Sequence, residues 1–124
     1  MATKTGTNGN NTLEGTSDSD VLYGLGGNDI LRGRDDADIL WGGDGNDALY
    51  GQGGDDRLIG ERGDDWLSGG SADNTFVFGL NSGEDIISDF VSDVDRDDNL
   101  IDVRGYGIRS FAALRNHLDE NGPG

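Results

Sequence analysis

Apolar residues recur along this chain at a spacing of nine, each one set among glycine and aspartate. In the segment from Gly42 to Tyr50, GGDGNDALY, one leucine at the eighth position follows six residues that favour turns. The same arrangement runs from Gly6 to Val77 without insertion or deletion, as eight consecutive nonapeptides. The eighth position is leucine in seven of them and Phe76 in the last. Because so short a segment cannot bury an apolar side chain alone, the pattern predicts repeats that stack on one another.

Each nonapeptide divides into a turn and a short strand. The first six residues have the form G-x-x-G-x-D, with glycine where the backbone is expected to take a positive φ angle. The last three alternate outward, inward and outward, and the inward residue is the leucine. Two strands and two turns make one coil of 18 residues, so eight repeats predict about four coils with two parallel sheets. Ala72, in the last repeat, stands at a turn position usually held by glycine and predicts that the regular turn fails there.

The outward positions predict two different faces. The odd repeats give a mixed surface of Thr12, Glu14, Ile30, Arg32, Ala48, Tyr50, Trp66 and Ser68. The even repeats give a more apolar surface of Val21, Tyr23, Ile39, Trp41, Arg57, Ile59, Thr75 and Val77. A continuous apolar strip on an acidic solenoid indicates that something covers it. Two alternatives stay open: the chain's own C-terminal segment, or a partner or ligand that binds around Tyr23 and Trp41.

The composition favours cations as partners. The formal net charge is −16, and 21 of the 25 acidic residues are aspartate, which suits turns. This charge argues against nucleic acid and against an anionic membrane surface, which both favour basic segments. No apolar run is long enough to insert across a membrane, and the N-terminus does not resemble a signal peptide. With only 32% hydrophobic residues, folding requires a source of energy besides an apolar core.

The nonapeptides resemble the G-G-x-G-x-D-x-U-x repeat of the RTX (repeats-in-toxin) family over residues 6–77. The resemblance implies an all-β, right-handed parallel β-roll, with calcium ions between the turns of successive coils. Calcium accepts about six to eight oxygen ligands in irregular geometry, so carboxylates and backbone carbonyls suit it. The implied metal-binding residues are Asn11, Asp20, Asp29, Asp38, Asp47, Asp56, Asp65 and Asn74, with the glycines Gly24, Gly33, Gly42, Gly51 and Gly60.

Residues at the sixth position stack in pairs, because repeats 18 residues apart lie on successive coils. The pairs are Asn11/Asp29, Asp20/Asp38, Asp29/Asp47, Asp38/Asp56, Asp47/Asp65 and Asp56/Asn74. Four pairs of aspartates predict four strong sites, and the two pairs with an asparagine predict weaker ones, for about six calcium ions in all. Without calcium the chain is expected to be largely disordered, and folding is expected to be steep in calcium concentration. The resemblance further implies export by the type I secretion machinery and folding outside the cell.

After Val77 the nine-residue period stops. Residues 78–124 predict a C-terminal cap of strands followed by a short helix with Ser110 as its N-cap, and residues 1–5 predict a short lead. The segment resembles the one that follows the repeats in RTX proteases and alginate epimerases. That resemblance implies one more calcium ion in the cap, with Asp85, Asp89 and Asp98 as candidate ligands.

No catalytic motif accompanies the repeats. The chain has no cysteine, no G-x-S-x-G and no H-E-x-x-H, and its single histidine, His117, lies in no partner pattern. We therefore predict a non-catalytic, calcium-dependent folding module of a type I secreted protein. One alternative is a calcium-dependent carbohydrate-binding module, similar to accessory modules of alginate epimerases, with polysaccharide bound on the aromatic face. Another is an adhesin or matrix spacer.

Overall fold

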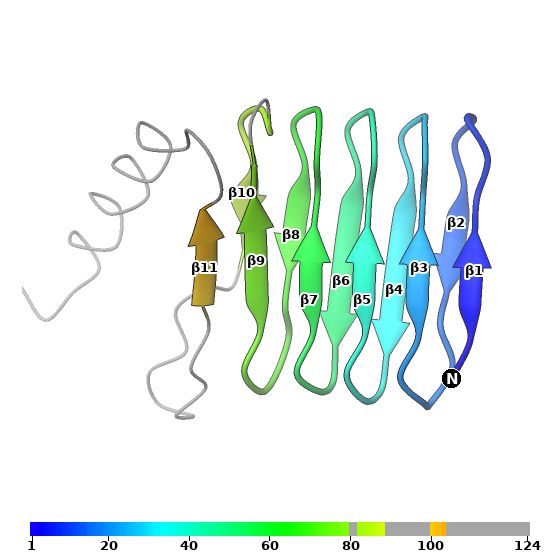
Figure 1. Ribbon diagram of the computed structural model, residues 1–124, viewed down its shortest axis with the longest axis vertical. Helices are drawn as coiled ribbons and strands as arrows, with labels where there is room; N and C mark the ends of the chain where they lie inside the picture. The colour runs from blue at the N-terminus through cyan, green and yellow to red at the C-terminus, as the bar shows by residue number, and fades with distance from the viewer. Residues whose placement is uncertain (80–81, 89–99, 104–124) are drawn as a thin grey trace, which may run out of the picture.

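The computed structural model describes residues 1–79, 82–88 and 100–103 of the chain. These residues form eleven short strands in two parallel sheets, and the chain alternates between the sheets as it winds along the molecule (Figure 1). The predicted parallel β-roll is therefore confirmed, with about five turns of about 18 residues. Within the described residues no helix is long and apolar enough to cross a membrane.

The strands belong alternately to a six-stranded and a five-stranded sheet. The six-stranded sheet contains, in spatial order, Thr3–Thr5 (β1), Val21–Tyr23 (β3), Ile39–Trp41 (β5), Arg57–Ile59 (β7), Thr75–Phe78 (β9) and Leu100–Val103 (β11). The five-stranded sheet contains Ile86–Ile87 (β10), Trp66–Ser68 (β8), Ala48–Gln52 (β6), Ile30–Arg34 (β4) and Thr12–Glu14 (β2). The odd and even nonapeptides thus supply different sheets, as the period predicts.

The core is a single ladder of side chains between the two sheets. The eighth residue of each nonapeptide points inward and lies opposite its counterpart on the neighbouring strand; Leu22 pairs with Leu40, and Leu40 with Leu58. The ladder consists of Leu22, Leu31, Leu40, Leu49, Leu58, Leu67 and Phe76, none of which has exposed surface. The predicted leucine ladder is confirmed. The ladder is one side chain wide, so the apolar core of the roll is thin.

The sheets continue beyond the eight predicted repeats at both ends. Strand β1 lies in the predicted lead and pairs with β3, with Lys4 where the other strands carry leucine. The Nζ of Lys4 donates a hydrogen bond to the carbonyl of Glu14 (2.6 Å). At the other end Ile86 lies opposite Trp66, and β11 adds a further strand beside β9. The coil therefore includes residues on both sides of the 6–77 segment that the nine-residue period delimits.

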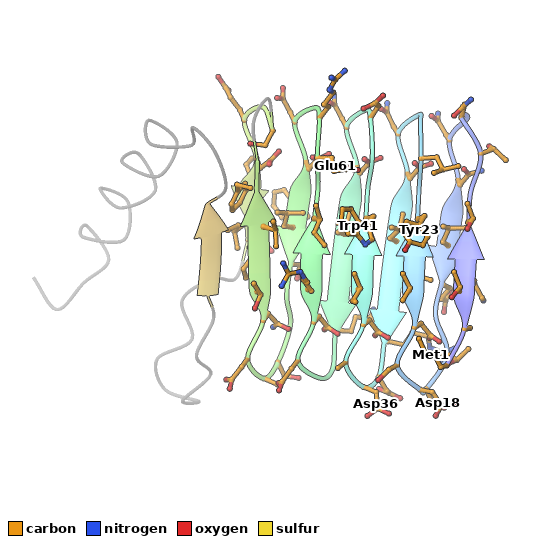
Figure 2. The ribbon with its side chains drawn as sticks, in the orientation of Figure 1. Met1, Asp18, Tyr23, Asp36, Trp41 and Glu61 are labelled. Carbon is orange, nitrogen blue, oxygen red and sulfur yellow. The ribbon has the colours of Figure 1, made fainter. Side chains whose placement is uncertain are left out.

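The outer face of the six-stranded sheet carries two aromatic rings side by side. Tyr23 and Trp41 lie on neighbouring strands with ring centroids 6.2 Å apart and an angle of 23° between ring planes (Figure 2). On the next strands of this face Ile59 and Val77 are only 6% and 9% exposed. Most of the predicted cover, the C-terminal segment 78–124, lies outside the described residues, so the two alternatives for this face stay open.

Candidate metal centre

From the second nonapeptide onward the sixth residue carries a buried polar side chain, whereas Asn11 in the first is partly exposed. The six aspartates Asp20, Asp29, Asp38, Asp47, Asp56 and Asp65 are 1–2% exposed, and Asn74 is fully buried. One side-chain oxygen of each accepts a hydrogen bond from the sixth-position backbone one coil earlier. The Asp29 N–H, for example, donates to Oδ1 of Asp47 (2.7 Å), and the Asp38 N–H to Oδ1 of Asp56 (2.8 Å). All six predicted pairs are brought together in this way.

The other carboxylate oxygen of most of these aspartates has no hydrogen-bond partner. Among the described residues the buried, unpaired atoms are Oδ2 of Asp29, Asp38, Asp47, Asp56 and Asp65. We call them the orphaned oxygens. Burying a carboxylate oxygen without a partner costs several kcal/mol by order of magnitude, and native proteins rarely leave such a group unsatisfied. A cation held at these atoms would remove the cost, because it replaces the lost hydration with direct coordination.

Each orphaned oxygen lies beside the first glycine of its own repeat. A Cβ atom placed on Gly24 would be 2.6 Å from Oδ2 of Asp29 and 2.5 Å from the carbonyl oxygen of Gly42, one coil further on. An equivalent carboxylate oxygen and carbonyl oxygen lie beside Gly15, Gly33, Gly42 and Gly51, but at Gly15 the carboxylate oxygen, Oδ2 of Asp20, already accepts a hydrogen bond from the Thr16 N–H. A carboxylate oxygen and a carbonyl oxygen from successive coils therefore both lie close to the glycine Cα. Any residue with a Cβ atom would clash with them. This cradle is where a cation could bind.

The positive φ angles occur at the second and fourth positions of the turn, not at the first. Gly43 and Gly45 have φ angles of 91° and 104°, and no first-position glycine has a positive φ. Residues other than glycine take the same conformation at Leu25, Arg34, Asp36, Gln52, Glu61 and Ala72. The prediction of positive φ was therefore wrong for the first glycine, which is needed because a side chain would strike the oxygens beside it. Ala72, at 68°, keeps the turn that we expected to fail there.

Burial raises the pKa of the central carboxyl groups. The pKa is raised to about 6 for Asp38, to about 7 for Asp47 and to about 8 for Asp56 and Asp65. Desolvation is the largest cause, neighbouring carboxylates add to it, and the hydrogen bond from the preceding coil opposes it. Asp20 differs, because the hydrogen bonds from Thr16 and Ala2 outweigh its desolvation and lower its pKa. The central stack therefore resists holding its negative charges unless a cation is present.

Two other predicted site residues, Asp85 and Asn74, have distinct surroundings. Asp85 continues the sixth-position ladder past the predicted repeats, since the Asp65 N–H donates to its Oδ1 (2.8 Å). Asn74 accepts the Asp56 N–H at Oδ1 (2.9 Å), but its Nδ2 donates to the Ser71 carbonyl (3.1 Å). Asn74 therefore places a donor where the aspartates place an oxygen. Asp89 and Asp98 lie outside the described residues.

Sequence reasoning missed a second ladder at the fifth position of the odd repeats. The Asn28 N–H donates to Oδ1 of Asn10 (2.7 Å), and the Asn46 N–H donates to Oδ1 of Asn28 (2.8 Å). Here each side chain accepts from the following coil, in the opposite direction to the sixth-position ladder. Asparagine recurring every 18 residues was the signal that could have found it. The two ladders tie successive turns together from both directions.

The chemistry of the donors restricts which metal fits. No group of three or more His, Cys, Asp or Glu side chains that could hold a metal ion occurs in the described part of the chain. The cradles present single carboxylate oxygens, such as Oδ2 of Asp47, together with backbone carbonyl oxygens. An all-oxygen, irregular donor set suits calcium, whereas zinc favours nitrogen and sulfur ligands in tetrahedral geometry.

A comparison with protein families agrees with this donor set. The RTX calcium-binding nonapeptide repeat matches the chain in four copies, at residues 5–40, 26–58, 41–76 and 50–87. The matched segments together cover more than half of the chain and include every orphaned oxygen. No curated protein and no solved structure matches the chain.

Proposed function

Because the chain belongs to the family of RTX calcium-binding nonapeptide repeats, and is a calcium-binding repeat domain, we propose that capture of calcium is what drives its folding. The observation that carries the proposal is the row of orphaned oxygens in the turns. In the absence of a cation each of them is buried at a cost and repels its neighbours along the stack. Calcium coordination replaces the unfavourable burial with a favourable interaction. Because the site exists only in the folded chain, the free energy of calcium binding stabilises the fold.

The remaining interactions are too weak to fold the roll alone. The core is a single ladder of seven apolar side chains, against the conformational entropy of a chain with 23 glycines and a charge of −16. Extracellular calcium modules bind at about 10⁻⁴ to 10⁻³ M, far above the concentration in cytosol. The chain would therefore stay unfolded inside the cell and fold outside it. This behaviour suits a domain of a secreted protein exported unfolded by the type I machinery, and we propose no catalytic role for it.

A titration of the calcium-free chain tests the proposal. Far-ultraviolet circular dichroism should change from a disordered to a β spectrum over a narrow range of calcium concentration, and magnesium should not replace calcium. Magnesium demands near-octahedral geometry and gives up its water reluctantly, so carbonyl-rich turns suit it poorly. A chain that is already folded in chelator, or that folds equally in magnesium, would contradict calcium-driven folding.

A second candidate function is binding of a polysaccharide on the six-stranded sheet. It is favoured by the neighbouring rings of Tyr23 and Trp41, which present aromatic faces of the kind that stack on sugar rings. Replacing both residues by alanine should abolish retention on an alginate column while calcium-induced folding persists. The matched control is Trp66→Ala, which removes an exposed aromatic residue from the other sheet. If the double variant no longer folds, the face is covered by another part of the protein instead.

A further inference from the structure

The first two nonapeptides turn differently from the six that follow. They begin at Gly6 and Gly15, and both have threonine at the second position. From the third nonapeptide onward, the second and fourth positions have positive φ angles in every repeat up to Ala72. In the first two repeats no second or fourth position does. The roll therefore contains two classes of turn, and threonine marks the first class.

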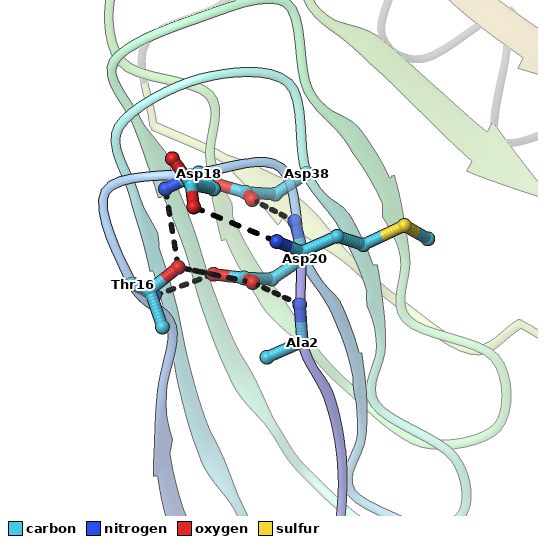
Figure 3. A network of polar contacts seen from close by, with 6 residues as sticks. Ala2, Thr16, Asp18, Asp20 and Asp38 are labelled. Atoms are coloured by element: carbon cyan, nitrogen blue, oxygen red, sulfur yellow. Dashed lines mark hydrogen bonds and ion pairs between the residues drawn. The ribbon is translucent and has the colours of Figure 1, made fainter.

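Thr16 and Ala2 together satisfy both oxygens of the Asp20 carboxylate (Figure 3). The Thr16 backbone N–H donates to Oδ2 of Asp20, and the Thr16 hydroxyl lies 3.0 Å from Oδ2 and 3.1 Å from Oδ1. The same hydroxyl accepts the N–H of Asp18 (3.1 Å), and the Ala2 N–H donates to Oδ1 of Asp20 (2.7 Å). Asp20 is as buried as the later aspartates, yet it has no orphaned oxygen.

Thr7 repeats this arrangement in the first nonapeptide. Its N–H donates to Oδ1 of Asn11 (2.6 Å), its hydroxyl lies 3.2 Å from the same oxygen, and the Gly9 N–H donates to the hydroxyl (3.1 Å). A threonine hydroxyl that accepts from a residue two positions on is a recognised way to close a turn. In both repeats the hydroxyl therefore shapes the turn and also supplies a donor to the sixth-position side chain.

Resting on the proposed function, we infer that the first coil, residues 6–23, binds no calcium and is held by threonine instead. The donors of Thr7 and Thr16 replace the cation that the later turns require. The pairs Asn11/Asp29 and Asp20/Asp38 then hold no ion, although the sequence predicts one at each. Each orphaned oxygen takes one ion, five in all, and the last of these lies between Asp65 and Asp85. The roll thus starts from a calcium-independent coil.

The first test removes the hydroxyl alone. Thr16→Val should lower the thermal unfolding temperature in saturating calcium by several degrees and leave the number of bound ions, counted by native mass spectrometry, unchanged. Thr16→Ser should restore the wild-type temperature, and Thr12→Val, at an exposed strand position, is the matched control. If Thr16→Val loses one ion, the hydroxyl is a ligand and the inference is wrong. An unchanged unfolding temperature would also overturn it.

The second test builds an ion-binding turn in place of the threonine turn. The double change Thr16→Gly and Asp18→Gly turns GTSDSD into GGSGSD, so the second and fourth positions can take positive φ. This variant should bind one calcium ion more than the wild type. An unchanged count would overturn the inference even if wild-type folding depends on calcium. Failure of the proposed function would instead appear in the wild type, as a chain that folds in chelator.

Discussion

Two glycines in neighbouring turns illustrate how differently the same residue is used. A Cβ on Gly42 would lie 2.5 Å from Oδ2 of Asp47 and 2.9 Å from the carbonyl oxygen of Gly60, inside the cradle. A Cβ on Gly53, at the third position of the next repeat, would meet nothing closer than 3.5 Å. Neither glycine has a positive φ angle. Alanine substitutions at Gly42 and at Gly53 therefore differ only in the atoms that the added methyl group would contact.

We predict that Gly42→Ala raises the calcium concentration needed for folding and destabilises the folded roll by about 1–3 kcal/mol, the usual range for an overpacked site. Gly53→Ala should be neutral or stabilise by up to about 1 kcal/mol, because alanine restricts the unfolded chain. Calcium titration followed by circular dichroism, with urea unfolding in saturating calcium, measures both effects. Equal effects of the two substitutions would contradict the cradle.

The sixth-position aspartates could be predicted from the sequence, but the conformation of the turns could not. Pairing at an interval of 18 follows from the period alone, and it holds for every predicted pair, such as Asp47 with Asp65. Positive φ at Leu25 or Glu61 carries no signal, because neither residue favours that region; the close stacking of turns imposes it. The hydrogen bonds from Thr16 to Asp20 were not predicted, because threonine occurs in turns for several other reasons.

At the scale of the strand, the side chain in the central ladder carries most of the apolar stabilisation. Leu49 in β6 lies in the middle of the ladder with no exposed surface, between Leu31 and Leu67 on the neighbouring strands. Leu13 in β2 occupies the equivalent position in the outermost strand of its sheet and is only half-buried. The same residue type at the same place in the repeat is therefore packed to different extents.

Leu49→Ala should destabilise the calcium-bound roll by about 2–5 kcal/mol, the range for a fully buried leucine that leaves a cavity. Leu13→Ala should cost distinctly less, because solvent already reaches part of its side chain. Urea unfolding at saturating calcium measures both free energies. Equal losses for the two variants would mean that stability is spread evenly along the ladder and does not depend on burial.

Strand positions were easier to predict from the sequence than the extent of the sheets. The nine-residue period locates the strands of the repeats because each has the buried residue of the ladder between a sixth-position turn residue and the next glycine, as in Val21–Tyr23, although β4 and β6 continue past that glycine. It misses β1, where Lys4 stands in the apolar position. It also stops short of β10, since two extra residues shift Ile86 out of phase with Trp66.

At the scale of the whole molecule, protons and calcium compete for the same carboxylates. In the folded, calcium-free roll the pKa values of Asp38, Asp47, Asp56 and Asp65 are raised to between about 6 and about 8. A carboxyl group whose pKa is raised by folding stabilises the fold at low pH, and this contribution is lost as pH rises through the folded value. The calcium-free roll is therefore least stable above about pH 8, where all these groups must ionise.

We expect the calcium-free chain to gain β structure as pH falls from 8 to 5. In the presence of calcium, the concentration needed for half-folding should rise over the same range, because protons must leave before the ion binds. Circular dichroism at a series of pH values, with and without calcium, measures both trends. The variant Asp47→Asn/Asp56→Asn is the control and should show a weaker pH dependence in calcium-free buffer. A calcium-free chain indifferent to pH would contradict the raised pKa values.

The two extra residues before Ile86 also bear on how the roll finds its alignment during folding. Between the preceding coils the offset is 18 residues throughout, so a chain displaced by one whole coil could form nearly the same hydrogen bonds and core contacts. Between Asp65 and Asp85 the offset is 20, and a displaced chain could not satisfy both spacings. The irregular coil thus gives the native alignment an energetic advantage over slipped ones. It is the position at which misaligned folding intermediates would be rejected.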